Sequence, residues 1–237
     1  MLRDKKVTAV IPARGGSKGI PRKNLYRLGN DTLLERTIKI GLACSRVDQV
    51  LVSTDDFEMY TIAEKYGVAS SGLRPEHLAT DSATTIDVII DLINTGEITD
   101  GLVLLLQVTS PLRKLEDLEA FFDSYLKAAP QIGASASVCG FDSPHPDKIQ
   151  VMENGILRSY IGKESMVPRQ FLPQVFALNG AFYINGTESI LKNRTFLPEN
   201  TLAFEMPVHK SLNLDSKYDL VLLEALLSNN LVEIDEL

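Results

Sequence analysis

A run of basic residues and glycines follows the first apolar segment of the chain. The stretch AVIPARGGSKGIPRKNL covers residues 9–25, and the residues from Ala13 to Asn30 include no Asp or Glu. Their basic members are Arg14, Lys18, Arg22, Lys23 and Arg27. The chain as a whole is acidic, with 24 Lys+Arg against 31 Asp+Glu. We expect Gly15 and Gly16 to permit positive φ and to let backbone N–H groups approach an anion. The segment therefore predicts a site for a small anion such as a triphosphate.

The glycine spacing excludes two common phosphate-binding loops. The pattern G-x-x-x-x-G-K-[ST] is absent, and glycines at 15, 16 and 19 do not match G-x-G-x-x-G. A solvated basic loop is the alternative that composition alone leaves open. Asn24 adds an amide that suits a ribose hydroxyl.

The elements around this loop alternate between apolar strands and amphipathic helices. We expect strands at 7–11, 49–53, 101–107 and 133–139, and helices at 32–45, 55–67, 84–96 and 115–129. Such alternation predicts an α/β fold of three αβα layers, Rossmann-like and doubly wound around a mostly parallel sheet. Ligands of such sheets bind beyond the carboxyl ends of the strands, where the 13–25 loop falls.

Local signals fix several helix ends. Thr32 and Glu35 have the spacing of a capping box, and Asp55 or Asp56 is expected to cap the next helix. Gly67 and Gly96 are predicted helix stops.

The alternation ends near Phe141. The Pro-rich stretch 141–200 predicts strands and loops outside the central sheet, forming an arm inserted into a single domain that spans 1–237. Within and after it, 181–185 is a predicted strand and 216–230 a predicted helix.

Composition limits the classes of partner. The net charge of −7 argues against a nucleic-acid binder, and no apolar run is long enough for a membrane span or a signal peptide. Two well-separated cysteines fit a reducing compartment, so we expect a cytoplasmic protein.

Several blocks of sequence carry a family resemblance. IPARGGSKGIPRKNL (11–25) resembles the N-terminal signature of the CMP-sialic acid synthetases, or acylneuraminate cytidylyltransferases. Further blocks are similar in the same order: STDD (53–56), LRPEHLATDSATT (73–85), LLQVTSPLR (105–113), PRQFLPQ (168–174) and NGAFYIN (179–185). The resemblance implies a nucleotide-diphospho-sugar transferase fold and a homodimer with a small dimerisation arm. The arm is also expected to bind sugar.

The resemblance also implies a reaction. CMP passes from CTP to the anomeric hydroxyl of a nine-carbon 2-keto-3-deoxy sugar acid, with N-acetylneuraminate as the favoured substrate. Pyrophosphate is released, and Mg²⁺ is the implied cofactor. The implied triphosphate ligands are Arg14, Ser17, Lys18 and Lys23. Asn24 is implied for the ribose, and Arg74, Thr85 and the backbone around Ala83 for cytosine. Without the resemblance, a surface salt bridge is the favoured role of Arg74.

The sugar site is implied by later residues. Gln107 ends an apolar strand and so points into the ligand crevice, where the family uses it for sugar hydroxyls. Lys148 and Arg169 match positions that recognise the carboxylate. Tyr183 and Phe196 match positions near the acyl group, with Phe196 serving the neighbouring subunit's site. Core packing is an equal alternative for both aromatics.

Two departures from the family pattern affect the metal and the sugar. Many members carry Asp-x-Asp where this chain reads SLNLD, so Asn213 replaces the first Asp and Asp215 remains. We expect Mg²⁺ to bind Asp215 and Asn213 more weakly than a two-Asp site, with Lys23, Arg14 and Asp215 as the catalytic residues. Ala177 stands where sialic-acid-specific relatives often have Arg. Legionaminic or pseudaminic acid therefore stays open as the sugar.

Two other functions remain as alternatives. A non-catalytic nucleotide-binding regulator is supported by Asn213 alone. A metal-dependent glycosyltransferase would need spaced aspartates, whereas Asp55 and Asp56 are adjacent. Cys139 and His145 form a weak candidate for a nucleophile pair, and core packing is favoured for that cysteine.

Overall fold

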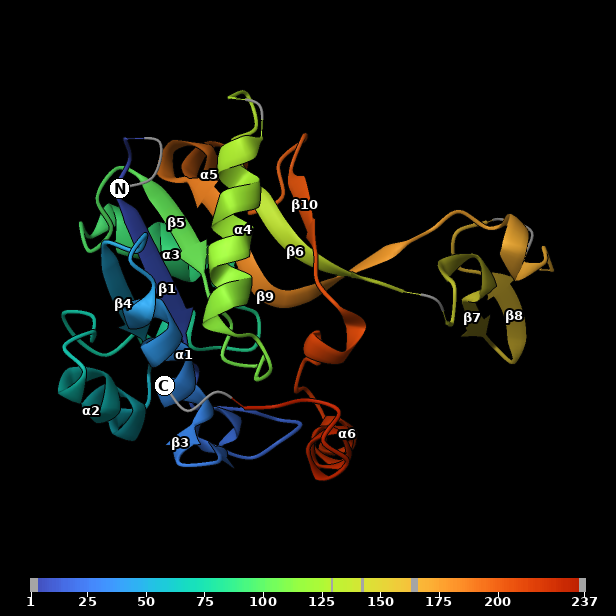
Figure 1. Ribbon diagram of the computed structural model, residues 1–237, viewed down its shortest axis with the longest axis horizontal. Helices are drawn as coiled ribbons and strands as arrows, with labels where there is room; N and C mark the ends of the chain where they lie inside the picture. The colour runs from blue at the N-terminus through green and yellow to red at the C-terminus, as the bar shows by residue number, and fades with distance from the viewer. Residues whose placement is uncertain (1–3, 129, 142, 163–165, 235–237) are drawn as a thin grey trace.

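A mixed sheet forms the centre of the molecule (Figure 1). The computed structural model describes residues 4–128, 130–141, 143–162 and 166–234. Within these residues the sheet has six strands in the order β10-β6-β9-β5-β1-β4. They are β1 (Val7–Pro12), β4 (Gln49–Ser53), β5 (Leu102–Leu105), β6 (Ser135–Gly140), β9 (Phe176–Gly186) and β10 (Leu202–Glu205). Neighbouring strands are parallel except β9, which is antiparallel to both β5 and β6.

Helices cover both faces of the sheet. The alternation of side chains along a strand sends Val7, Ala9 and Ile11 of β1 into one hydrophobic cluster and Val10 into another. The first cluster includes residues of α1 (Leu33–Ala43), α2 (Phe57–Lys65), α4 (Leu115–Lys127) and α6 (Lys217–Ser228). The second includes residues of α3 (Thr85–Asn94) and α5 (Thr187–Asn193). The predicted three-layer α/β architecture is confirmed.

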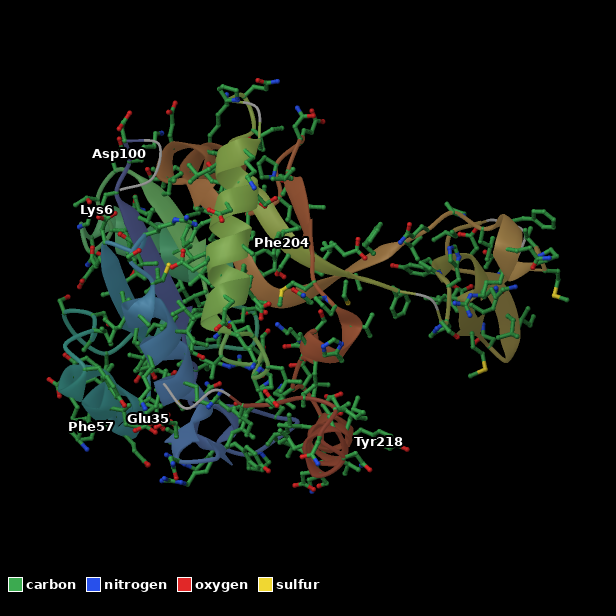
Figure 2. The ribbon with its side chains drawn as sticks, viewed as in Figure 1. Lys6, Glu35, Phe57, Asp100, Phe204 and Tyr218 are labelled. Carbon is green, nitrogen blue, oxygen red and sulfur yellow. The ribbon has the colours of Figure 1, made fainter. Side chains whose placement is uncertain are left out.

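Aromatic packing ties the far edge of the sheet to its covering helix. Phe204 of β10 is labelled in Figure 2. Its ring meets Phe121 of α4 edge-on, with ring centroids 5.5 Å apart. Phe121 also stacks on Phe182 of β9 at 5.3 Å. The predicted helix 115–129 ends earlier, at Lys127, and its last residue lies outside the described residues.

The capping signals act as predicted. Thr32 Oγ1 accepts a hydrogen bond from the Glu35 N–H at 3.2 Å, and the Glu35 carboxylate accepts one from the Thr32 N–H at 2.8 Å. Asp56 Oδ1 caps α2 by accepting from the Met59 N–H at 3.0 Å. Gly67 and Gly96 follow their helices with φ of +69° and +80°. A two-stranded ribbon of β2 (Arg27–Leu28) and β3 (Asp31–Thr32) precedes α1.

The prediction that 141–200 lies outside the central sheet is wrong for its second half. β9 (Phe176–Gly186) runs between β5 and β6, and α5 packs on the sheet face. The partners of β9 are more than 35 residues away in the sequence, so no local pattern marks it as central. The first half does form an arm, which extends away from the sheet and ends in the antiparallel pair β7 (Gln150–Glu153) and β8 (Ile156–Ser159) (Figure 1).

Candidate functional site

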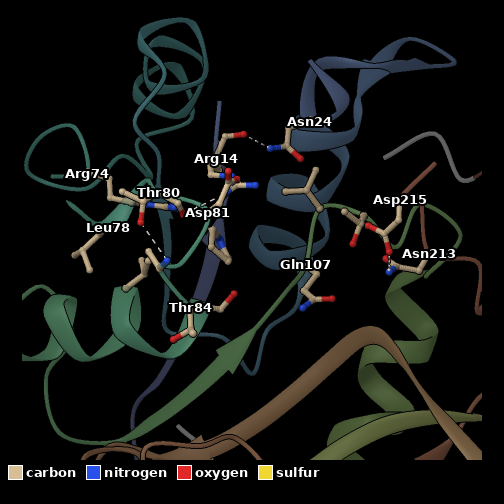
Figure 3. Close-up of a pocket in the computed structure, with 16 residues that line it drawn as sticks. Arg14, Asn24, Arg74, Leu78, Thr80, Asp81, Thr84, Gln107, Asn213 and Asp215 are labelled. Atoms are coloured by element: carbon tan, nitrogen blue, oxygen red, sulfur yellow. Dashed lines mark hydrogen bonds and ion pairs between the residues drawn. The ribbon is translucent and has the colours of Figure 1, made fainter. Parts of the chain in front are cut away.

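A cavity of about 460 Å³ opens where β1 and β5 end (Figure 3). Segments far apart in the sequence form its wall, because parallel strands bring their carboxyl ends to one edge of the sheet. The predicted site residues that line it are Arg14, Asn24, Arg74, Ala83, Thr85, Gln107, Asn213 and Asp215. The other predicted residues lie in the basic loop, in the arm or in the hydrophobic core.

The basic loop is held by carboxylates on two sides of this cavity. Lys18 Nζ lies 2.5 Å from Asp81, and Arg14 Nη1 lies 3.1 Å from the same carboxylate. Lys23 Nζ donates to Asp215 Oδ1 at 2.9 Å. The hydrogen bond from Lys18, together with the charges of Lys18 and Arg14, lowers the pKa of Asp81. Arg14, Lys18 and Lys23 of the loop therefore each pair with a carboxylate, Asp81 or Asp215, that lines the cavity.

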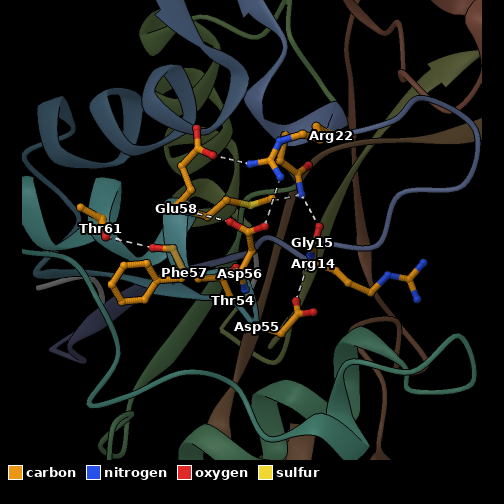
Figure 4. A network of polar contacts seen from close by, with 11 residues as sticks. Arg14, Gly15, Arg22, Thr54, Asp55, Asp56, Phe57, Glu58 and Thr61 are labelled. Carbon is orange, nitrogen blue, oxygen red and sulfur yellow. Dashed lines mark hydrogen bonds and ion pairs between the residues drawn. The ribbon is translucent and has the colours of Figure 1, made fainter.

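The glycines of the loop act differently from prediction. Gly15 and Gly16 do not have positive φ, so that expectation is wrong, and the left-handed residue is Arg22 with φ of +53°. The Gly15 N–H donates to Asp55 Oδ1 at 2.9 Å (Figure 4). A Cβ built on Gly19 would lie 1.9 Å from the Asp215 carbonyl oxygen. Glycine at 19 thus serves a close approach between two backbones.

Asp55 and Asp56, the two carboxylates that follow β4, bind other parts of the fold. Asp55 binds the Gly15 backbone, and Asp56 caps α2 and lies 3.6 Å from Arg22 (Figure 4). Ser17 lies in the same loop, where its N–H donates to the Gly15 carbonyl at 3.1 Å. The Asn24 amide donates to the Arg14 carbonyl at 2.9 Å and so fixes the backbone that enters the loop.

The opposite wall contains a buried arginine and a helix N-terminus. Arg74 is buried, its Nε donates to Ser53 Oγ at 3.1 Å, and its guanidinium also donates to the Ser53 carbonyl. A surface salt bridge for Arg74, the role favoured by its sequence alone, is therefore wrong. Burial lowers the pKa of Arg74, and the charge of Arg14 lowers it further while Asp55 opposes the shift. Thr85 begins α3 behind the capping residue Thr84, which places the positive end of a helix dipole at the cavity.

Gln107 reaches the cavity because the backbone of β9 makes room for it. Gly180 has φ of +75°, and a Cβ there would lie 2.4 Å from Gln107 Oε1. Ser110 Oγ donates to the Asn179 carbonyl at 3.2 Å beside it. Sequence reasoning found Gln107 but had no signal for its support by Gly180, since β9 was not expected in the sheet.

Tyr183 and Phe196 pack in the second hydrophobic cluster. Both are buried, and their ring centroids lie 6.2 Å apart. Neither is among the residues that line the cavity. Burial raises the pKa of the Tyr183 phenol, and a hydrogen bond with the Gly180 backbone opposes that shift. The structure gives both residues a packing role, and their contact with a sugar stays a prediction.

Lys148 and Arg169 both lie in the arm. Lys148 ends a 3-10 turn at Pro146–Lys148, and Arg169 begins another at Arg169–Phe171. Both side chains are exposed, and neither lines the cavity of this chain. Lys148 Nζ donates to the Val167 carbonyl at 3.0 Å, which brings the two turns together.

Asn213 and Asp215 are the candidate metal ligands. Asn213 Nδ2 donates to Asp215 Oδ2 at 2.6 Å. Asn213 Oδ1 is buried without a hydrogen-bond partner in the described part of the chain. No cluster of three or more His, Cys, Asp or Glu side chains suited to a metal occurs among the described residues. One carboxylate and an amide oxygen in need of a partner fit Mg²⁺, which commonly takes its other ligands from phosphates and water.

Sequence reasoning missed several acidic and backbone groups around the site. Asp81 holds two cations of the loop, and Thr80 contributes its carbonyl to Arg14 at 3.0 Å. Asp219 accepts hydrogen bonds from the Asp215 and Ser216 N–H groups at 2.9 and 2.6 Å. Asp81 lies inside a block that carried the resemblance, but its pairing with Lys18 depends on residues 63 positions apart.

Across the described residues, no helix has the length and apolar character that a membrane crossing requires.

Comparison with known proteins gives consistent relatives. The sequence profile of a family described as cytidylyltransferase matches residues 8–148. The chain is 31% identical over 229 residues to CMP-N,N'-diacetyllegionaminic acid synthase of Legionella pneumophila, covering 95% of this chain and 97% of that protein.

Two further comparisons extend this result. The chain is 30% identical to N-acylneuraminate cytidylyltransferase of Streptococcus agalactiae serotype V over 91% of its own length, and it spans 52% of that protein. A solved CMP:2-keto-3-deoxy-manno-octonic acid synthetase with CTP has a TM-score of 0.69 at 17% identity, covering 95% of this chain and 99% of that one. That likeness shows the shared fold.

Proposed function

The chain belongs to the cytidylyltransferase family, and on that premise we propose that it transfers CMP from CTP to a nine-carbon 2-keto-3-deoxy sugar acid. The observation that best supports this is the cavity at the sheet edge, where a basic loop faces a buried arginine and a helix N-terminus. Because Cys44 and Cys139 are both free thiols, we expect the reaction to occur in the reducing cytoplasm.

The basic loop is the proposed triphosphate site. Arg14, Ser17, Lys18 and Lys23 would bind the phosphates, with Asp81 and Asp215 giving up their ion pairs as the phosphates replace them. The anomeric hydroxyl oxygen of the sugar attacks the α-phosphorus, and the bond to the bridging oxygen of the β-phosphate breaks. Pyrophosphate leaves and the hydroxyl proton passes to solvent. Lys23, which donates to Asp215, would follow the charge onto the departing pyrophosphate.

The far wall is the proposed base site. Arg74, Thr85 and the backbone at Ala83 would read cytosine, and Asn24 would hold the ribose. Gln107 lines the same cavity and is the proposed contact for a sugar hydroxyl. Arg74 is held rigidly by Ser53, so its donors are fixed before the nucleotide arrives.

Mg²⁺ is the proposed cofactor. Asp215 and Asn213 would hold it, which would give the partnerless Asn213 Oδ1 a cation to bind. The metal would supply neutralisation of charge on the phosphates.

A homodimer would bring the arm to a cavity. Lys148 and Arg169, the proposed ligands of the sugar carboxylate, lie in an arm directed away from the body of their own chain (Figure 1). The arm also exposes a set of large apolar side chains, as expected of an interface: Met152, Ile156, Leu157, Tyr160, Met166 and Phe171. Phe196, by contrast, is buried within its own chain.

Mixing two inactive variants tests this arrangement. Lys23→Ala damages the body and Arg169→Ala damages the arm. If arms act on the neighbouring subunit, re-equilibrated mixtures contain mixed dimers with one intact site, and about a quarter of the wild-type activity returns. Mixtures that stay inactive, with dimers shown to exchange, would mean that each arm serves its own chain.

Pyrophosphate release tests the activity itself. The enzyme is incubated with CTP, Mg²⁺ and either N-acetylneuraminate, N,N'-diacetyllegionaminic acid or pseudaminic acid. We expect release with a member of this panel, N-acetylneuraminate being the first choice, and none when UTP replaces CTP. Failure with every sugar acid, while CTP still binds, would favour the non-catalytic regulator.

A further inference from the structure

The root of the arm contains a buried histidine in an otherwise exposed segment. Among the described residues of 141–175, only His145 and Asp147 are buried, and His145 is 6% exposed. A polar ring removed from water needs hydrogen-bond partners for its nitrogens. The partners of His145 show what the ring does.

Both ring nitrogens are engaged. His145 Nε2 lies 3.0 Å from the Pro173 carbonyl oxygen, which can only accept, so Nε2 carries the hydrogen. The Asp147 N–H donates to His145 Nδ1 at 3.2 Å. The His145 carbonyl also accepts from the Lys148 N–H at 2.8 Å. The imidazole thus caps the turn that ends in Lys148 and bonds across the arm.

The bond across the arm joins the two turns that carry the proposed carboxylate ligands. Lys148 follows His145 by three residues, and Pro173 follows Arg169 by four. The Lys148 Nζ bond to the Val167 carbonyl also spans the two segments, but it comes from an exposed and flexible side chain. The Phe141 N–H donates to the Val175 carbonyl at 3.0 Å and joins the two segments nearer the sheet. The buried ring of His145 is a second link, closer to the two turns.

We propose that His145 is a positioning residue for sugar binding. Its Nε2–H bond to Pro173 fixes the Lys148 turn against the Arg169 turn, so that two cations face one carboxylate at a set separation. Pre-set cations bind a carboxylate without first being ordered. This inference rests on the proposed function, in which Lys148 and Arg169 recognise the sugar's carboxylate.

Two substitutions separate the capping bond from the bond across the arm. In His145→Gln the amide nitrogen takes the place of Nε2 and can still donate to Pro173. In His145→Asn the amide oxygen takes the place of Nδ1, so the cap survives and the link is lost. We expect His145→Asn to raise KM for the sugar acid about fivefold to tenfold, the usual effect of one lost hydrogen bond. KM for CTP should stay unchanged, and His145→Gln should stay within about threefold of wild type on both substrates.

Controls decide how a negative result is read. Arg158→Gln, in exposed β8, should leave both KM values unchanged. Lys148→Ala and Arg169→Ala are measured in parallel; if they leave KM for the sugar unchanged, the carboxylate assignment fails and His145 fails with it. If they raise it while His145→Asn does not, only the role of His145 is overturned. Equal impairment of the Gln and Asn variants, or a parallel rise in KM for CTP, also overturns it. Should His145→Asn not fold, His145→Ala against His145→Gln repeats the comparison.

Discussion

Substitution of Gly19 by alanine gives the sharpest test of how the basic loop meets the segment that carries the proposed metal ligands Asn213 and Asp215. The new Cβ would lie 1.9 Å from the Asp215 carbonyl oxygen, whereas real Cβ contacts essentially never fall below 3.0 Å. The obstacle is backbone, which cannot rotate aside, so the loop and the Asp215 segment must separate by about 1.1 Å or more. A shift of that size would move Lys23, a proposed phosphate ligand, relative to Asp215, a proposed metal ligand, which now lie 2.9 Å apart.

The expected loss is large because positioning dominates this chemistry. A misplacement of about 1 Å typically costs about 10²-fold in rate, so kcat/KM for pyrophosphate release should fall by about that factor. Overpacking of this kind also costs about 1–3 kcal/mol of stability, or roughly 2–4 °C in Tm for each kcal/mol.

Gly16→Ala is the matched control in the same loop. A Cβ on Gly16 meets no atom within 4 Å, and its φ is not positive, so activity and Tm should stay close to wild type. The reasoning is refuted if Gly19→Ala keeps activity within about threefold of wild type, because a misplacement of about 1 Å should cost far more. It is also refuted if Gly16→Ala is impaired equally.

Three further predictions concern single side chains. Lys23→Ala should lower kcat about 10²-fold, because it removes a preorganised charge beside the phosphates; a loss of only a few-fold in a single-turnover assay would contradict the placement. Asn213→Asp should lower the Mg²⁺ concentration that gives half-maximal activity, since a carboxylate binds Mg²⁺ better than an amide oxygen; an unchanged titration would argue against this metal site. Burial raises the pKa of Cys44 from 9.0 to about 11, so a thiol reagent at pH 8 should label half-buried Cys139 first and Cys44 only on unfolding. Between pH 9 and about 11 the unfolded chain loses the Cys44 proton, whereas the folded chain keeps it. The free energy of unfolding should therefore fall as the pH rises through this range. This fall should be less steep in Cys44→Ala.

Local sequence signals predicted the layers and the helix ends well. Thr32 and Glu35 cap α1, Asp56 caps α2, and the strand at 49–53 has the predicted bounds. These features depend on residues within a few positions of one another, so the sequence contains their whole cause. Local sequence does not predict the placement of β9, because its partners β5 and β6 are distant in the chain. The residues of an apolar strand do not indicate which strands will pair with it.

The same division runs through the site. The sequence alone supplied the residues of the proposed site: the acid-free basic loop, Arg74, Gln107 and a single aspartate at 215. Only the tertiary structure decided how they meet. Asp81 pairs with Lys18, Gly19 packs against the Asp215 backbone, Gly180 makes room for Gln107, and the arm that contains Lys148 extends away from the sheet. Each of these depends on two backbone segments being brought together in space, and the side-chain pattern of one segment contains no information on the distance to the other.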